Sequence, residues 1–175
     1  MRLPALLLAL LTAGACAAPT TAVAPTPTPQ IGVRLSGGGE FSAKDPLAIV
    51  YNTKLVPEGA KASVTVESAD GQTRSSFVAE GLLPNRAYGV HLHANPCGSK
   101  PDDSGPHFQH THGTVNASNE VWLDIKTDGS GAATSTARQP WALSPDRVPH
   151  SLVIHEKATA PDGTAGGRVA CLTLK

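Results

Sequence analysis

The sequence predicts an all-β domain, a β-sandwich or Greek-key β-barrel of about eight antiparallel strands. Short apolar or alternating segments recur along most of the chain, turn signals separate most of them, and no long helical periodicity is present. The 17 glycines and 15 prolines are typical of a domain with many turns. A chain of 175 residues is long enough for one domain with a substantial core and short for two.

The first 44 residues are expected to lie outside this domain. Residues 1–17 have the pattern of an export signal, in which Arg2 precedes an apolar stretch too short to span a bilayer. The small residues before Cys16 resemble a bacterial lipobox, whose cysteine becomes lipidated, and cleavage by an ordinary signal peptidase is the alternative. Residues 18–44, rich in Ala, Pro, Thr and Gly, predict a flexible linker.

These features predict an exported bacterial protein, either a cell-surface lipoprotein or a secreted one. Contact with a membrane is expected only through the N-terminal lipid. Because the formal net charge is zero, nothing favours nucleic acid or an anionic membrane surface as a partner. The pattern predicts no particular oligomeric state.

Residues 45–175 form the predicted domain and contain the strand-like segments. Asp70-Gly71 and Asp128-Gly129 are hairpin turn signals between four of these segments. In the segment 121–127, every second residue is apolar from Val121 onward, which predicts one buried face. In chain order, the expected strands are 47–56, 62–67, 73–79, 88–93, 121–127, 132–137, 151–155 and 169–174.

The three cysteines, at positions 16, 97 and 171, indicate a disulfide. An odd cysteine in an exported protein needs an explanation. If Cys16 carries a lipid, Cys97 and Cys171 remain as a pair in an oxidising compartment, where a disulfide persists. Two separate buried thiols are the alternative interpretation.

Five of the seven histidines lie within residues 88–112, and this cluster predicts a metal site. His91 and His93 are two residues apart at the end of a strand-like segment, so their side chains share one face. His107 lies in the following loop, and His155 ends the segment 151–155 on the same face as Val153. Imidazoles without a thiolate suit copper or zinc better than calcium or magnesium. Chance clustering is the alternative.

Four short blocks occur in the order expected for one enzyme family. The blocks 89–93 (Gly-Val-His-Leu-His), 105–108 (Gly-Pro-His-Phe), 152–157 (Leu-Val-Ile-His-Glu-Lys) and 166–171 (Gly-Gly-Arg-Val-Ala-Cys) resemble signature blocks of the Cu/Zn superoxide dismutase family. The resemblance covers about residues 45–175 and implies a Greek-key β-barrel. It further implies a copper site made by His91, His93, His107 and His155.

The resemblance also implies roles for three other residues and for His107. Cys97 and Cys171 match the family's intrasubunit disulfide, and Arg168 matches the arginine beside the copper. His107 matches the histidine that contacts both metals when zinc is present.

The zinc-binding loop of the family is cut short in this chain. His110, His112 and Glu120 are the remaining candidates for a zinc site. The alternative is that Glu120 or another polar group hydrogen-bonds the free nitrogen of His107. The loop between His155 and Arg168 is also short, and both features resemble the copper-only branch of the family.

The expected activity is the conversion of superoxide to dioxygen and hydrogen peroxide at a histidine-bound copper. Arg168 is expected to guide the anion, and His107 to take up and return a proton. A non-catalytic module that buffers copper with the same fold is the main alternative. A domain with a purely structural role is a third interpretation, which the complete set of copper ligands disfavours.

Overall fold

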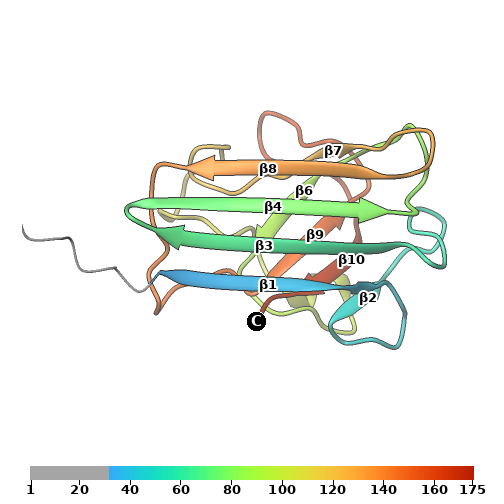
Figure 1. Ribbon diagram of the computed structural model, residues 1–175, viewed down its shortest axis with the longest axis horizontal. Coiled ribbons are helices and arrows are strands. Elements are labelled where there is room, and N and C mark those ends of the chain that lie inside the picture. The colour runs from blue at the N-terminus through green and yellow to red at the C-terminus, as the bar shows by residue number, and fades with distance from the viewer. Residues whose placement is uncertain (1–31) are drawn as a thin grey trace, which may run out of the picture.

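The computed structural model describes residues 32–175, so the predicted signal, the lipidation candidate Cys16 and most of the predicted linker lie outside the described residues. The described chain is all-β, as predicted. Two four-stranded sheets lie face to face, and every pairing between named strands is antiparallel. In Figure 1 the strands of one sheet run across the front, and β6, β9 and β10 cross behind them at a steep angle.

The first sheet consists, in spatial order, of β1 (Val33–Glu40), β3 (Lys61–Ala69), β4 (Gln72–Glu80) and β8 (Ala133–Gln139). Every second side chain of β3 and β4 is buried, because successive residues of a strand point to opposite faces. The turn between β3 and β4 has positive φ at both Asp70 (52°) and Gly71 (75°). This is the backbone that a two-residue hairpin needs, and it confirms the turn signal.

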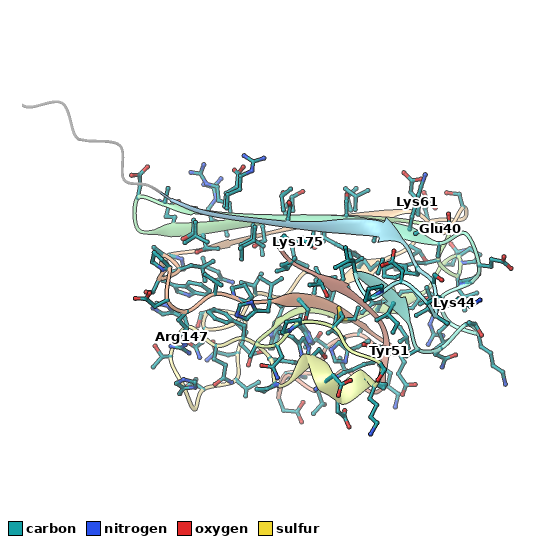
Figure 2. All side chains as sticks on the ribbon, turned by 90° about the horizontal axis from the view of Figure 1, so that it is seen from below. Glu40, Lys44, Tyr51, Lys61, Arg147 and Lys175 are labelled. Atoms are coloured by element: carbon teal, nitrogen blue, oxygen red, sulfur yellow. A yellow bond between two sulfur atoms is a disulfide. The ribbon has the colours of Figure 1, made fainter. Side chains whose placement is uncertain are left out.

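The second sheet carries the histidine-rich segments. Its spatial order is β2 (Ala48–Val50), β10 (Arg168–Thr173), β9 (Ser151–His155) and β6 (Val90–His93). Leu92, Leu152 and Leu172 point from this sheet into the main core, where they meet Val64, Val66 and Phe77 of the first sheet. Figure 2 shows side chains filling the space between the two layers.

Contacts at both sides join the two sheets. Ser36 and Lys175 exchange two backbone hydrogen bonds, which tie β1 to the end of β10. On the other side, β5 (Ala87–Tyr88) pairs with β7 (Ile125–Lys126), next to β6 and β8 in sequence. Strands far apart in sequence are neighbours in both sheets, as Greek-key connections require.

The predicted boundary at residue 45 is wrong, because β1 lies inside the segment predicted as a linker. β1 pairs with β3 along its whole length. Its glycines indicate a close approach between strands rather than a flexible break: a Cβ on Gly37 would lie 2.6 Å from the carbonyl oxygen of Thr173.

Two predicted strands are shorter than expected. Of residues 47–56, only Ala48–Val50 is a strand. In 121–127 the alternation is confirmed, since Val121, Leu123 and Ile125 are buried. The regular strand within this segment is only β7, however. This segment lies beside β6, with backbone bonds from Leu92 N–H to the Val121 oxygen and from Leu123 N–H to the Val90 oxygen.

The described residues contain one short 3-10 helix, η1 (Pro101–Ser104). Among residues 32–175, no helix has the length and apolar character needed to cross a membrane.

Candidate metal centre

The alternation of β6 places its two histidines on one face of the second sheet. Val90 and Leu92 point into the main core, so His91 and His93 point to the opposite face. Both imidazoles are fully buried, because the loops that follow β6 and β9 cover this face. The prediction that His91 and His93 share a face is confirmed.

The neighbouring strand β9 supplies the third histidine. Val153 lies opposite His91 in the register and packs in a small apolar cluster with Ile49 and Cys171. His155 ends β9 on this side of the sheet and is 4% exposed.

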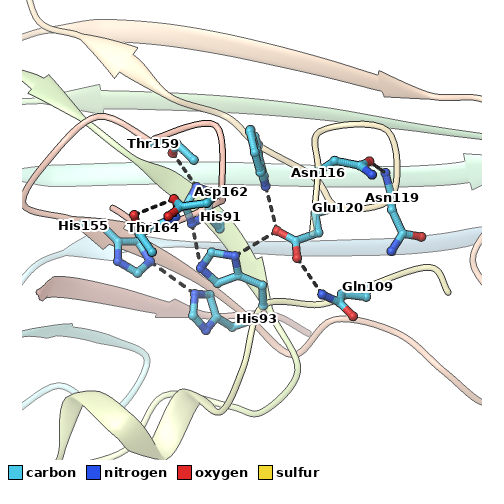
Figure 3. A network of polar contacts seen from close by, with 12 residues as sticks. His91, His93, Gln109, Asn116, Asn119, Glu120, His155, Thr159, Asp162 and Thr164 are labelled. Carbon is cyan, nitrogen blue, oxygen red and sulfur yellow. Dashed lines mark hydrogen bonds and ion pairs between the residues drawn. The ribbon is translucent and has the colours of Figure 1, made fainter. Parts of the chain in front are cut away.

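The fourth histidine comes from the loop after η1. His107 forms an isolated antiparallel bridge with His93, which fixes its place beside β6. One ring nitrogen from each of the four histidines lies within 4.8 Å of the others. Figure 3 shows His91, His93 and His155 arranged around one point.

Each ring has an inner nitrogen, which points toward the centre, and an outer nitrogen, which points away from it. In three of the rings the outer nitrogen faces an oxygen that can only accept a hydrogen bond. His93 Nδ1 lies 2.9 Å from the Gly105 carbonyl oxygen, and His155 Nδ1 lies 3.2 Å from the Gly166 carbonyl oxygen. His107 Nδ1 lies 2.9 Å from Glu120 Oε2. Because these oxygens only accept, each outer nitrogen carries the proton, and each inner Nε2 presents a lone pair to the centre.

The inner nitrogens are close enough to repel one another. His91 Nδ1 and His107 Nε2 are 2.9 Å apart, and His93 Nε2 and His155 Nε2 are 3.3 Å apart. Lone pairs at these separations repel one another, and a cation bound between them would remove the repulsion. A set of four converging imidazole nitrogens without thiolate fits a borderline transition metal such as copper.

Burial lowers the pKa of His91, His93 and His155 and keeps these three rings neutral at physiological pH. It lowers the pKa of His91 to about 2, with further lowering from the rings of His107, His155 and His93. Burial likewise lowers the pKa of His155 to about 4 and holds the pKa of His93 well below its usual value. Neutral imidazole is the form that binds a metal, so no proton has to be removed before a metal binds.

Glu120 is the buried carboxylate of the site. It accepts hydrogen bonds from His107 Nδ1, from Trp122 Nε1 at 2.7 Å and from Gln109 Nε2 at 2.9 Å. Burial raises the pKa of Glu120, but these hydrogen bonds outweigh it and the net pKa is lowered. An ionised Glu120 therefore accepts the hydrogen bond of His107 Nδ1, the nitrogen that points away from the centre. This is the contact expected as the alternative to a zinc site, and Figure 3 shows Glu120 in this network.

The segment that carries Glu120 is fastened to the first sheet. Gln139, at the end of β8, donates from Nε2 to the carbonyl oxygens of Ala117 and Glu120. Trp141 donates from Nε1 to the Ser118 oxygen, 2.7 Å away. These hydrogen bonds fix the position of the segment that carries Glu120.

The predicted zinc ligands are not brought together. The ring of His110 stacks on Trp141 with centroids 4.6 Å apart, and His112 is exposed. Within residues 32–175, the four-histidine centre is the one group of three or more potential ligands that converge. The shortened loop explains this outcome, because Glu120 turns inward to His107 while the two histidines lie toward the surface.

A disulfide and Arg168 fix the loop that holds His93. Cys97 and Cys171 are bonded across 74 residues, a link worth about 4–5 kcal/mol in the chain-entropy model. Arg168, paired with His155 in the sheet, donates from Nη1 to the Pro101 oxygen and to Ser104 Oγ, both at 2.9 Å. Its positive charge lies close enough to lower the pKa of His93 and His155.

An open groove of about 710 Å³ leads to one side of the centre. Phe108, Val148, His150 and Asp162 line it, with His107 and Glu120 at its inner wall. The side chain of His107 is 18% exposed, so this is the ring that solvent reaches.

Sequence reasoning did not find the outer partners of three rings. The carbonyls of Gly105 and Gly166 have no sequence signature, because any residue offers a carbonyl. Thr159, whose Oγ1 lies 2.6 Å from His91 Nε2, was equally hidden in a loop. Only Glu120 was named in advance, through the alternative to zinc.

Comparison with known proteins agrees with this geometry. The family model for copper/zinc superoxide dismutase (SODC) matches residues 60–173, which is more than half of the chain. No curated protein matches the chain. The match spans all four clustered histidines, both bonded cysteines and Arg168. The chain therefore belongs to the copper/zinc superoxide dismutase family.

Proposed function

We propose that this protein is a copper-dependent superoxide dismutase that works without zinc outside the cytoplasm. His91, His93, His107 and His155 would hold the copper. The observation that carries the proposal is the bond from His107 Nδ1 to Glu120, because a carboxylate stands where a second metal would otherwise be bound. The export-signal pattern of residues 1–17 supports the location.

Copper held by these four histidines would supply the redox chemistry of the dismutation. The protein supplies geometry, charge and protons. Four neutral imidazoles add no charge of their own, and Arg168 provides a fixed cation beside His155, which attracts a small anion.

His107 is the residue suited to proton transfer. It faces the groove, and Glu120 stabilises the charge when both ring nitrogens are protonated. His107 Nε2 takes up a proton in one half of the cycle and gives it to the reduced dioxygen in the other. With a second proton from solvent, two superoxide anions and two protons yield dioxygen and hydrogen peroxide.

Arg168 separates this function from copper buffering, because a copper store needs no cation to guide an anion. We expect Arg168→Ala to lower the dismutation rate per bound copper about tenfold, and Arg168→Lys to restore part of the rate. Arg34→Ala, on the exposed face of β1, is the control.

Pulse radiolysis of the copper-loaded variants measures the rate, and chelator competition measures the affinity. If copper-loaded wild type is no more active than free copper, the buffering function is supported instead. An unchanged rate per bound copper in Arg168→Ala would contradict the guiding role.

A further inference from the structure

His91 differs from the other three rings in the partner of its outer nitrogen. Its Nε2 lies 2.6 Å from the hydroxyl oxygen of Thr159, and the ring is fully buried. A hydroxyl both donates and accepts, so this contact alone leaves the tautomer of His91 undetermined. If the hydroxyl donated to Nε2, the proton of the neutral ring would sit on Nδ1 and point into the metal centre.

Asp124 determines the direction of this hydrogen bond. Thr159 Oγ1 lies 2.7 Å from Asp124 Oδ1, and the backbone N–H of Thr159 donates to Oδ2 at 2.8 Å. The N–H of Val90 donates to Oδ1 at 3.1 Å. A carboxylate only accepts, so the hydroxyl proton of Thr159 goes to Asp124 and its lone pair faces His91 Nε2–H.

Asp124 is too far from the His91 ring to form this hydrogen bond directly, so the Thr159 hydroxyl acts as a relay between them. His91 Nε2 and Asp124 Oδ1 are 3.6 Å apart, beyond hydrogen-bond distance. The residue before β6 leaves room for the hydroxyl, since a Cβ on Gly89 would lie 2.9 Å from Thr159 Oγ1. Three parts of the chain therefore meet at the hydroxyl group of Thr159. They are the loop after β9, the residue directly before β7, and strand β6.

We propose that Thr159 is a positioning residue, which fixes the proton of His91 on Nε2. Through the Thr159 hydroxyl, the negative charge of Asp124 also polarises the Nε2–H bond of the ring. The lone pair of Nδ1 then faces the centre, 2.9 Å from His107 Nε2. The inference rests on the proposed function in taking copper as the resident metal. An outer partner that accepts a proton also makes the ring a stronger electron donor to a metal.

The substitution that tests the relay is Thr159→Val, which removes the hydroxyl, nearly keeps the shape and retains the N–H that bonds Asp124 Oδ2. Thr159→Ser keeps the hydroxyl and should rescue. Thr164→Val is a matched control in the same loop, because Thr164 Oγ1 also donates to an aspartate, Asp162 Oδ1 at 2.7 Å, and has no hydrogen bond to a histidine within residues 32–175.

The first measurement is ¹⁵N NMR of the imidazoles in the metal-free full chain. In wild type, Thr159→Ser and Thr164→Val we expect His91 with its proton on Nε2. In Thr159→Val we expect a mixture of both tautomers. A pure wild-type tautomer in Thr159→Val would overturn the proposal.

The second measurement is Cu(II) affinity by chelator competition, with the EPR spectrum of the copper-loaded chain. Thr159→Val should bind copper about tenfold more weakly and show altered nitrogen hyperfine splitting, while Thr159→Ser stays near wild type. An affinity for Thr159→Val within twofold of that of Thr164→Val would overturn the proposal.

Asp124→Asn keeps the inference testable if Thr159→Val fails to fold. Its amide can donate to Thr159 Oγ1 and reverse the relay, so we expect weaker copper binding and His91 protonated on Nδ1. An unchanged tautomer would contradict the relay. These readouts need no dismutase activity, so a chain that binds copper without activity would refute the proposed function and leave the relay standing.

Discussion

His93 and His155 differ from His91 and His107 in what holds the outer ring nitrogen. Backbone carbonyls hold the first pair, from Gly105 and Gly166. Side chains hold the second pair, and both chains of contacts end in a carboxylate: Glu120 directly, and Asp124 through the Thr159 hydroxyl.

This difference separates a fixed half of the site from an adjustable one. A carbonyl depends on the path of the backbone and offers no charge, so only a change in the backbone conformation alters it. A carboxylate can be replaced by one substitution, and its charge affects both the tautomer and the basicity of the ring. The adjustable half includes His107, the ring that is open to the groove and to protons.

The largest expected effect comes from removing one ring of either pair. His155→Ala and His107→Ala should each abolish dismutase activity and weaken copper binding at least about 100-fold, because three imidazoles leave a gap in the coordination. His150→Ala, an exposed histidine in the groove, is the control and should behave as wild type. Copper retained by His155→Ala at wild-type affinity would contradict the four-ligand centre.

The next effect tests the side-chain pair. Glu120→Gln keeps the shape but lets an amide donate to His107 Nδ1, which moves the ring proton toward the centre. We expect copper affinity to fall about 10- to 100-fold. Asp162→Asn, a groove carboxylate bonded to Thr164, is the control, and equal affinities by chelator competition would show that Glu120 does not set the tautomer.

The backbone pair is expected to respond to a glycine substitution instead. Gly166 has φ of 74°, which aims its carbonyl at His155, and an added Cβ would lie 2.6 Å from Glu156 Cγ. Gly166→Ala should lower the free energy of unfolding by about 1–2 kcal/mol and weaken copper binding. At Gly167 the nearest atom to a Cβ is 3.6 Å away, so Gly167→Ala in the same denaturation series should cost less. Equal losses would argue against a conformational role for Gly166.

The smallest expected effect is one in which His91 and His155, one ring from each pair, behave alike. Burial first, then the neighbouring rings, lowers the pKa of His91 to about 2, and burial lowers that of His155 to about 4. Unfolded histidine binds a proton near pH 6.5, so below that pH the unfolded chain binds more protons than the folded one. The free energy of unfolding of the metal-free chain should therefore fall as pH falls. The decrease is at most about 1.4 kcal/mol per pH unit for each ring.

The contribution of His155 should stop changing near pH 4, while that of His91 should continue toward pH 2. Urea unfolding at pH 7, 6 and 5 measures this slope, and His91→Gln should reduce it. A stability that is constant between pH 7 and 5 would show that burial does not control these rings.

The sequence predicted the centre better than its surroundings. His91 and His93 follow the period of two of a strand, and Val153 with His155 follows the same rule, so their shared face could be derived from alternation. The disulfide was predicted from the count of three cysteines in an exported chain, and the role of Arg168 from the ordered family blocks. These features depend on local pattern or on specific residue types, which a sequence displays directly.

The remaining features depend on contacts between distant segments. The glycines of β1 suggested a linker, because a close approach to Thr173 cannot be seen without the fold. The family resemblance left His110, His112 and Glu120 as zinc candidates, but stacking on Trp141 and the inward turn of Glu120 separate those groups. Thr159 gains its role only because Asp124 of another segment lies beside it.

Metal content with activity before and after chelation tests the central claim most directly. The full chain would be stripped of metal, reloaded with copper alone or with copper and zinc, and assayed for superoxide dismutation. We predict one copper per chain, full recovery with copper alone and no gain from zinc. Recovery that requires zinc, or copper binding without activity above free copper, would contradict a copper-only dismutase built on these four histidines.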